Sequence, residues 1–108
     1  MTLILGRLAA GDDLVEGIEA FAHQHGLTHA AVRSGPGSLV YGTLNSGGAD
    51  IPVPGPGTEV LSLLGEVTPD GASLHGALGD PDGRVYAGRF VRGQNPICIT
   101  LEFALEPR

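Results

Sequence analysis

The sequence contains no lysine, no tryptophan, one cysteine and five aromatic residues among 108. All six basic residues are arginines, they stand against twelve acidic residues, and the formal net charge is -6. Because duplex DNA is bound mainly through neutralised phosphates, a chain without a basic run is a poor non-specific DNA binder. This argument concerns the field of the whole molecule, so a local cluster of arginines stays open.

The lone cysteine, Cys98, excludes an intrachain disulfide and fits a reducing compartment. It lies in the apolar run Ile97 to Ile99, where a small buried side chain is expected rather than a reactive thiol. The apolar start, Met1 to Leu8, is too short for a signal peptide, and no segment reaches the roughly 20 apolar residues of a membrane span. These features predict a cytoplasmic protein with no membrane segment.

The length and a hydrophobic content of 42% predict a single domain, residues 1–108, around one aliphatic core. Asp13, with Glu16 three positions on, has the spacing of a helix capping box, and Gly26 suits a helix end. Between them Leu14, Ile18, Phe21 and Ala22 recur at helical spacing.

The rest of the chain is rich in β-favouring segments separated by glycine and proline. Strands are expected over 2–8, 27–33, 39–45, 58–67, the two arms of 73–90 and 97–105, with a loop or edge segment over 46–57. The glycine-rich stretch Ser34 to Ser38 lies between two strands, which favours a β-bulge or corner over a phosphate loop, since a phosphate loop needs a following helix. One early helix followed by many strands indicates an α+β fold with a mostly antiparallel or mixed sheet.

The hairpin from Ser73 to Phe90 carries the densest polar chemistry. Asp80 and Asp82 flank its turn, where they are expected to form the turn rather than act as an acid and a base. Ser73 and His75 share one face of a strand, but no third group is evident to orient the histidine for nucleophilic catalysis. His75 beside Arg89 could form a small anion or carboxylate site, and a purely structural histidine is the alternative.

A second histidine pair, His23 and His25, falls at the end of the expected helix. Residues two apart on a helix point to different faces, so the pair is not suited to bind one metal ion. A favourable interaction with the negative end of the helix is the expected role.

Four segments in order, covering roughly Leu3 to Leu105, resemble the PPC domain (plant and prokaryote conserved domain), including its stand-alone bacterial and archaeal members. They are GDDL at the helix start, SGPGSL beside the family's SGIGSL, EVLSLLG beside EILSLSG, and LHGALGD with GRVYAG beside LHASLGDxDGRVYGG. The resemblance implies a compact fold with one main helix near the N-terminus and a strongly bent, mostly antiparallel sheet, assembled as a homotrimer. The family's DNA-binding label comes with AT-hooks, and the Arg-Gly-Arg core of an AT-hook is absent here.

Some prokaryotic members of that family carry three histidines that suit zinc, two in an HxH pair and one on the next strand. In this chain only His75 matches, because Ser73 and Arg89 stand at the other two positions. An arginine puts a positive charge where a metal ion would lie, so we expect no metal or other cofactor and a small anion instead. Family geometry suggests that Arg33 and Glu59 line the same trimer cleft.

Two classes of function follow. The first is a trimeric binding or regulatory module that recognises a small anion or a protein partner through His75, Arg89, Ser73, Arg33 and Glu59. The alternative is a small enzyme in which His75 is a general acid or base and Arg89 holds an anionic substrate. A DNA-associated role follows from the family label alone. The missing histidine trio and the lack of an evident nucleophile favour the first class.

Overall fold

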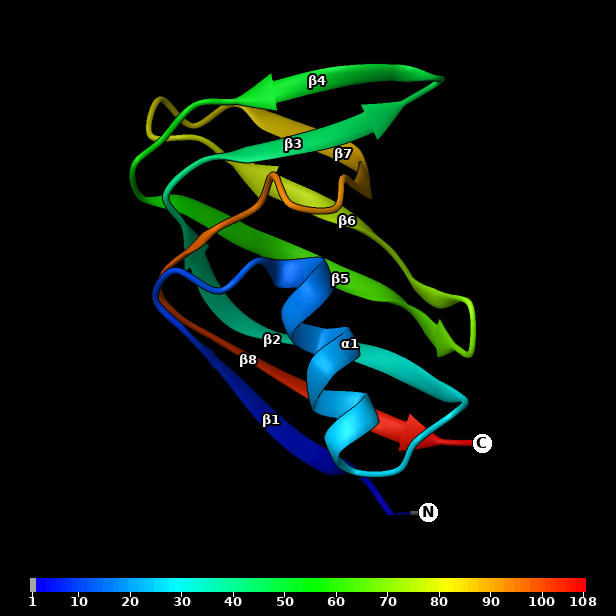
Figure 1. Cartoon of the computed structure of the whole chain (residues 1–108). Helices are drawn as coiled ribbons and strands as arrows, with labels where there is room; N and C mark the ends of the chain where they lie inside the picture. The colour runs from blue at the N-terminus through cyan, green and yellow to red at the C-terminus, as the bar shows by residue number, and fades with distance from the viewer. Residues whose placement is uncertain (1) are drawn as a thin grey trace.

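A computed structural model describes residues 2–108 and shows one helix packed on one face of an eight-stranded sheet (Figure 1). The elements in chain order are β1 (Ile4–Ala9), α1 (Leu14–Gln24), β2 (Ala30–Leu39), β3 (Gly42–Ser46), β4 (Ala49–Val53), β5 (Thr58–Thr68), β6 (Gly71–Gly79), β7 (Val85–Phe90) and β8 (Ile97–Pro107). The predicted α+β class, with its single helix near the N-terminus, is confirmed over the described chain.

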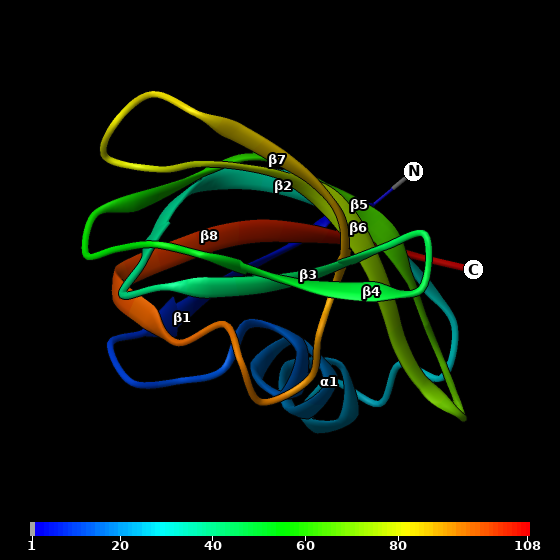
Figure 2. The ribbon, with the colours of Figure 1, turned by 90° about the horizontal axis from the view of Figure 1, so that it is seen from above.

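The strand order is β1-β8-β2-β5-β6-β7-β3-β4, and each recorded pairing is antiparallel. Figure 2 shows that the sheet is bent, with β1 at one end and β3 and β4 at the other curving toward the side that α1 occupies. The strongly bent, antiparallel sheet is therefore as expected. We call the face that carries α1 the inner face and the opposite one the outer face.

Helix α1 begins where the sequence predicts, because the Asp13 carboxylate accepts hydrogen bonds from the backbone N–H groups of Val15 and Glu16 at 3.1 and 3.0 Å. Its apolar face is buried against the inner face of the sheet. Gly17 lies on this side, where an added Cβ would come 2.7 Å from Leu8 Cδ1, so the missing side chain sets how closely the helix approaches β1. The helix ends before Gly26, whose positive φ of +67° suits glycine.

The glycine-rich stretch forms a bulge, as predicted, but the bulge lies inside one strand, β2, and not between two strands. The register of β2 against β8 shifts between Ser34 and Gly37 and again between Gly37 and Leu39. At Gly35 an added Cβ would lie 2.3 Å from the backbone oxygen of Glu102, so only glycine fits there. No helix follows the stretch, because β2 continues to Leu39.

The predicted strand over 39–45 is wrong in its bounds, since β2 ends at Leu39 and β3 begins at Gly42. The break falls there because Asn95 binds both backbone groups of Thr43, and Gly42 leaves room for this contact. The segment 46–57 contains the edge strand β4, in agreement with the expected loop or edge segment. Its turn at Gly47 and Gly48, both with positive φ, is typical of a tight hairpin.

Candidate functional site

The β6–β7 hairpin is held in shape by Asp80, whose side chain is buried. The carboxylate accepts hydrogen bonds from the backbone N–H groups of Asp82 and Arg84 and from the Tyr86 hydroxyl, all at 2.9 Å. Burial raises the pKa of the Asp80 carboxyl, but these donors outweigh it and the net pKa is lowered; the pKa of Tyr86 is raised mainly by its bond to this carboxylate. Asp80 is therefore a turn former, as predicted, and the hairpin presents β6 and β7 in a fixed register.

The registers of β2, β5, β6 and β7 align four side chains, three of them polar, in one row across the outer face. His75 on β6 lies opposite Arg89 on β7 and, on its other side, opposite Leu64 on β5. Leu64 in turn lies opposite Arg33 on β2. All four side chains are exposed, while their chain neighbours Val32, Leu63, Leu74 and Phe90 face the core. We call these four residues, Arg33, Leu64, His75 and Arg89, the outer row.

A shallow hollow of about 400 Å³ lies along the outer row. Its lining brings together three of the residues predicted from the sequence, namely Arg33, Ser73 and His75, with Glu66 and Arg108. Arg89 does not line the hollow but stands next to it, as the register partner of His75. Strands β2, β5 and β6 thus build the floor, and β7 contributes the rim.

Arg33 is already paired. Its guanidinium donates to both carboxylate oxygens of Glu106, each at 3.0 Å. Both bonds come from one nitrogen, Nη2, and the carboxylate of Glu106 offsets the positive charge beside it. Arg33 therefore lines the hollow, but its charge is already paired and is not available to an anion in the way that an unpaired arginine is.

Arg89 and Glu66 are different, because neither has a side-chain hydrogen bond or ion pair with the described residues, which are 2–108 without the side chain of Ser34. Glu66 lies opposite Ser73, next to His75 along the same face. Arg33, Arg89, Arg108 and Glu66 lie in the outer row or line its hollow, and Glu106 pairs with Arg33.

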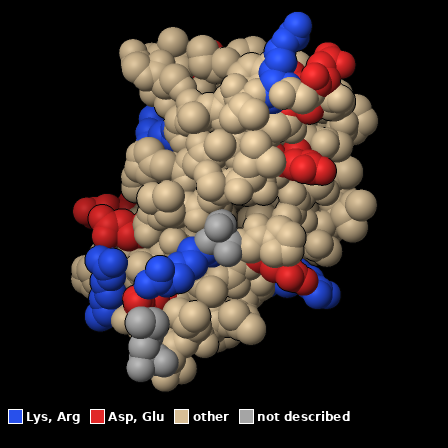
Figure 3. Space-filling view, turned by 180° about the vertical axis from the view of Figure 1, so that it is seen from behind, with Lys and Arg blue, Asp and Glu red and all other residues tan. Residues whose placement is uncertain are grey.

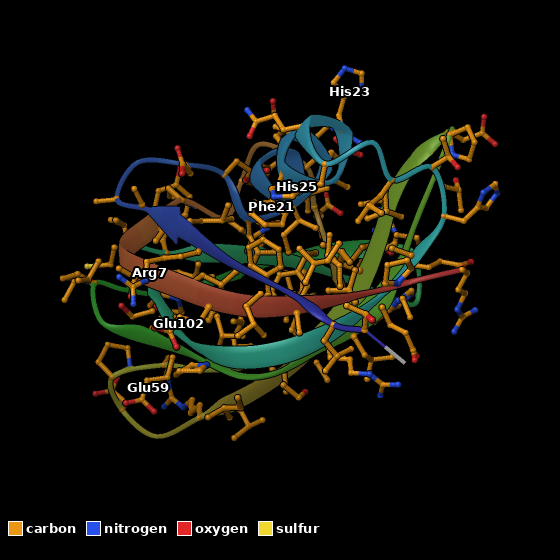
Figure 4. All side chains as sticks on the ribbon, turned by 90° about the horizontal axis from the view of Figure 1, so that it is seen from below. Arg7, Phe21, His23, His25, Glu59 and Glu102 are labelled. Atoms are coloured by element: carbon orange, nitrogen blue, oxygen red, sulfur yellow. The ribbon has the colours of Figure 1, made fainter. Side chains whose placement is uncertain are left out.

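Glu59 lies elsewhere in the single chain. It is opposite Gly79, at the other end of β5, and lines a separate hollow with the β6–β7 turn. Figure 4 shows it on the outer side of the sheet, away from Phe21 and His25 under the helix. Its predicted place in a common cleft with Arg33 stays a prediction that depends on assembly.

Another ionic cluster ties the helix to the sheet. Glu19 on α1 pairs with Arg92 through both oxygens and accepts the backbone N–H of Ala72 at 2.7 Å. The bond to Arg92 lowers the pKa of Glu19 although partial burial opposes it, and the same bond raises the pKa of Arg92. Each polar group has its partner, so we assign this cluster a structural role.

Within the described part of the chain, no three His, Cys, Asp or Glu side chains are grouped so as to hold a metal ion. His25 stacks on Phe21, with ring centroids 4.1 Å apart, and its Nδ1 lies 2.9 Å from the backbone oxygen of that residue, in keeping with the predicted interaction at the helix end. Over residues 2–108 no helix is long and apolar enough to cross a membrane.

Sequence reasoning missed Leu64, Glu66 and Arg108 as parts of the site. The alternation of β5 places Leu64 and Glu66 on one face, but only the register places them beside His75 and Ser73. Arg108 comes to the hollow because its backbone N–H donates to the oxygen of His29 at 2.9 Å. No pattern in the sequence indicates that contact.

The family model of the Plants and Prokaryotes Conserved (PCC) domain matches residues 1–107. This is the family that the sequence motifs resemble. Among curated proteins, the bifunctional protein GlmU of Synechococcus sp. (strain JA-3-3Ab) is 36% identical over 88 residues, which are 81% of this chain and 14% of that protein. The chain thus spans a small part of that relative's length.

Two solved structures share the fold. A hypothetical protein from Salmonella enterica has a TM-score of 0.84 and 30% identity, over 98% of this chain and 78% of the other. A plant- and prokaryote-conserved (PPC) protein from Pyrococcus horikoshii has a TM-score of 0.83 and 23% identity, over 100% of this chain and 80% of the other. Over the matched part, these proteins thus share the fold of this chain.

Proposed function

The chain belongs to the PCC domain family, and we propose that it is a homotrimeric binding module that takes a small anion at the outer row. The proposal rests on one observation above all. The exposed Arg89, which has no ion-pair partner among residues 2–108, stands beside His75 in an otherwise acidic chain. Residues directly opposite on adjacent antiparallel strands have Cβ atoms about 5 Å apart, so the guanidinium of Arg89 and the imidazole of His75 can both donate to one carboxylate or phosphate.

The composition of the outer face supports self-association. On this face β6 and β7 carry Gly79, Ala77 and Ala87, which have little or no side chain. Leu61 and Val85 flank them and are 51% and 65% exposed in the single chain. Figure 3 shows the outer face with charged side chains toward its margins and uncharged residues between them. We call Leu61, Ala77, Val85 and Ala87 the apolar patch.

An exposed apolar area with a polar rim is typical of a surface that packs against another protein. A closed ring of three copies covers such a patch on each subunit at once. The outer row borders the patch on β5, β6 and β7, so assembly would place the anion site at the edge of a subunit contact.

The anion proposal is tested by isothermal titration of the whole chain with 4-methylpentanoate and with inorganic phosphate. We expect saturable binding of at least one of them and a loss of about tenfold in affinity in Arg89→Gln, which corresponds to about 1.4 kcal/mol for one charge-assisted contact. Arg84→Gln is the matched control, because it removes the same charge from an exposed position of the same hairpin. If both variants lost the same affinity for the anion, the loss would be explained by the change in net charge, and the proposed site at Arg89 would be overturned.

A further inference from the structure

We propose that the ligand is a zwitterion of the amino acid type, with its ammonium group on Glu66 and its carboxylate on His75 and Arg89. This inference rests on the proposed function and specifies its ligand class. It starts from Arg89 and Glu66, two charges of opposite sign in the site that have no side-chain partner among the described residues. A simple anion uses Arg89 and leaves Glu66 without a role.

Glu66 lies opposite Ser73, while His75 lies opposite Leu64 two residues away along each strand. Glu66 and His75 are therefore diagonal neighbours on the outer face, about 7 to 8 Å apart at the backbone. Their side chains can converge on groups that share one carbon atom. The ammonium and carboxylate of an α-amino acid are such a pair.

Ser73 stands beside Glu66 and adds a hydroxyl that can accept a second ammonium hydrogen. Its side chain is exposed, as are those of Glu66 and His75, so the three polar groups are accessible from one side. Arg33 cannot easily replace Arg89 as the carboxylate partner, because Glu106 already occupies it. These contacts set the orientation of the ligand, with its ammonium group toward β5 and its carboxylate toward β7.

Leu64 indicates what the rest of the ligand is. It is 59% exposed and lies in the outer row between Arg33 and His75. A hydrocarbon side chain lying over Leu64 would remove apolar surface of both groups from water. The geometry therefore favours an aliphatic amino acid over glycine.

The test compares L-leucine, 4-methylpentanoate, 3-methylbutylamine and glycine by isothermal titration of the whole chain. 4-Methylpentanoate is leucine without its amino group, and 3-methylbutylamine is leucine without its carboxylate. We expect leucine to bind about fivefold more tightly than 4-methylpentanoate, the effect of one exposed ion pair, and at least about tenfold more tightly than 3-methylbutylamine, which loses the contact to Arg89. Glycine should bind more weakly than leucine.

Glu66→Gln assigns the ammonium site. In this variant the preference for leucine over 4-methylpentanoate should fall to about one, whereas Asp82→Asn, which removes one negative charge at the exposed hairpin turn, should preserve it. Glu66 is exposed, so the variant is expected to fold, and the circular dichroism and melting temperature of the Glu66→Gln protein check this.

The outcomes separate the two proposals. Equal binding of leucine and 4-methylpentanoate overturns the zwitterion and leaves the anion site. Binding of none of the four probes, nor of phosphate, overturns the anion site as well. A leucine preference that persists in Glu66→Gln places the ammonium elsewhere, and equal binding of glycine removes Leu64 from the site.

Discussion

Asn95→Ala should destabilise the protein more than any substitution of an exposed polar residue. Asn95 is fully buried, and its side chain accepts the N–H of Thr43 at 3.1 Å and donates to the oxygens of Thr43 and Val91 at 3.1 and 2.9 Å. Alanine removes all three bonds: the Thr43 N–H loses its partner, whereas the oxygens of Thr43 and Val91 keep the bonds that they accept from the N–H groups of Val91 and Gln94. At about 1 kcal/mol for each bond, the loss is about 3 kcal/mol, or roughly 15 °C in melting temperature for a domain of this size.

Urea unfolding followed by circular dichroism measures this loss, at one fixed protein concentration because assembly adds to stability. Asn45→Ala is the control: that amide makes one side-chain bond, at 2.8 Å to Asp50 on the neighbouring strand, and should cost no more than about 1 kcal/mol. A loss below about 1 kcal/mol in Asn95→Ala would refute the reasoning. It would mean that β3 does not depend on Asn95 for its start.

Three further predictions concern acid stability, assembly and metal. Because the pKa of Asp80 is lower in the folded chain, its carboxylate contributes to the free energy of unfolding above about pH 4, and this contribution is lost as the pH falls through the folded pKa. Asp80→Asn should therefore lower the stability measured by urea unfolding at pH 7, and lower it much less at pH 2.5. An equal loss of stability at both pH values would contradict this. Wild-type protein should have a trimer mass by light scattering and Leu61→Glu or Val85→Glu a lower one, while an unchanged mass would remove the apolar patch from the interface. Purified protein should hold little zinc by elemental analysis; near-stoichiometric zinc that disappears in His75→Ala would replace the anion site by a metal site.

The elements with local signals were predictable from the sequence. Asp13 and the apolar spacing that follows it located the helix, and the Asp-Pro-Asp-Gly turn located the hairpin that carries His75. Both depend on contacts within a few residues. The pairing of His75 with Arg89 followed from that same turn, because a hairpin fixes the register of its own two strands.

The predictions that failed concern features that depend on residues far away in the chain. The start of β3 is set by Asn95, 52 residues from Thr43, and the segment before it looks like one continuous strand without that knowledge. Glu66 and Leu64 joined the site only through the register of β5 on β6, which includes a shift between Val60 and Ser62. A one-residue slip would turn both side chains to the inner face.

The histidine resonances give the most direct test of the anion site. The chain has four histidines, and only His75 lies in the outer row; His23 and His25 at the end of α1 serve as internal controls, whereas His29 bonds the backbone of Arg108 beside the hollow. In a heteronuclear titration of the whole chain with 4-methylpentanoate, the ring signals of His75, identified by their absence in His75→Gln, should shift saturably while those of His23 and His25 stay in place. Shifts confined to the other histidines, or none at all, would contradict the account.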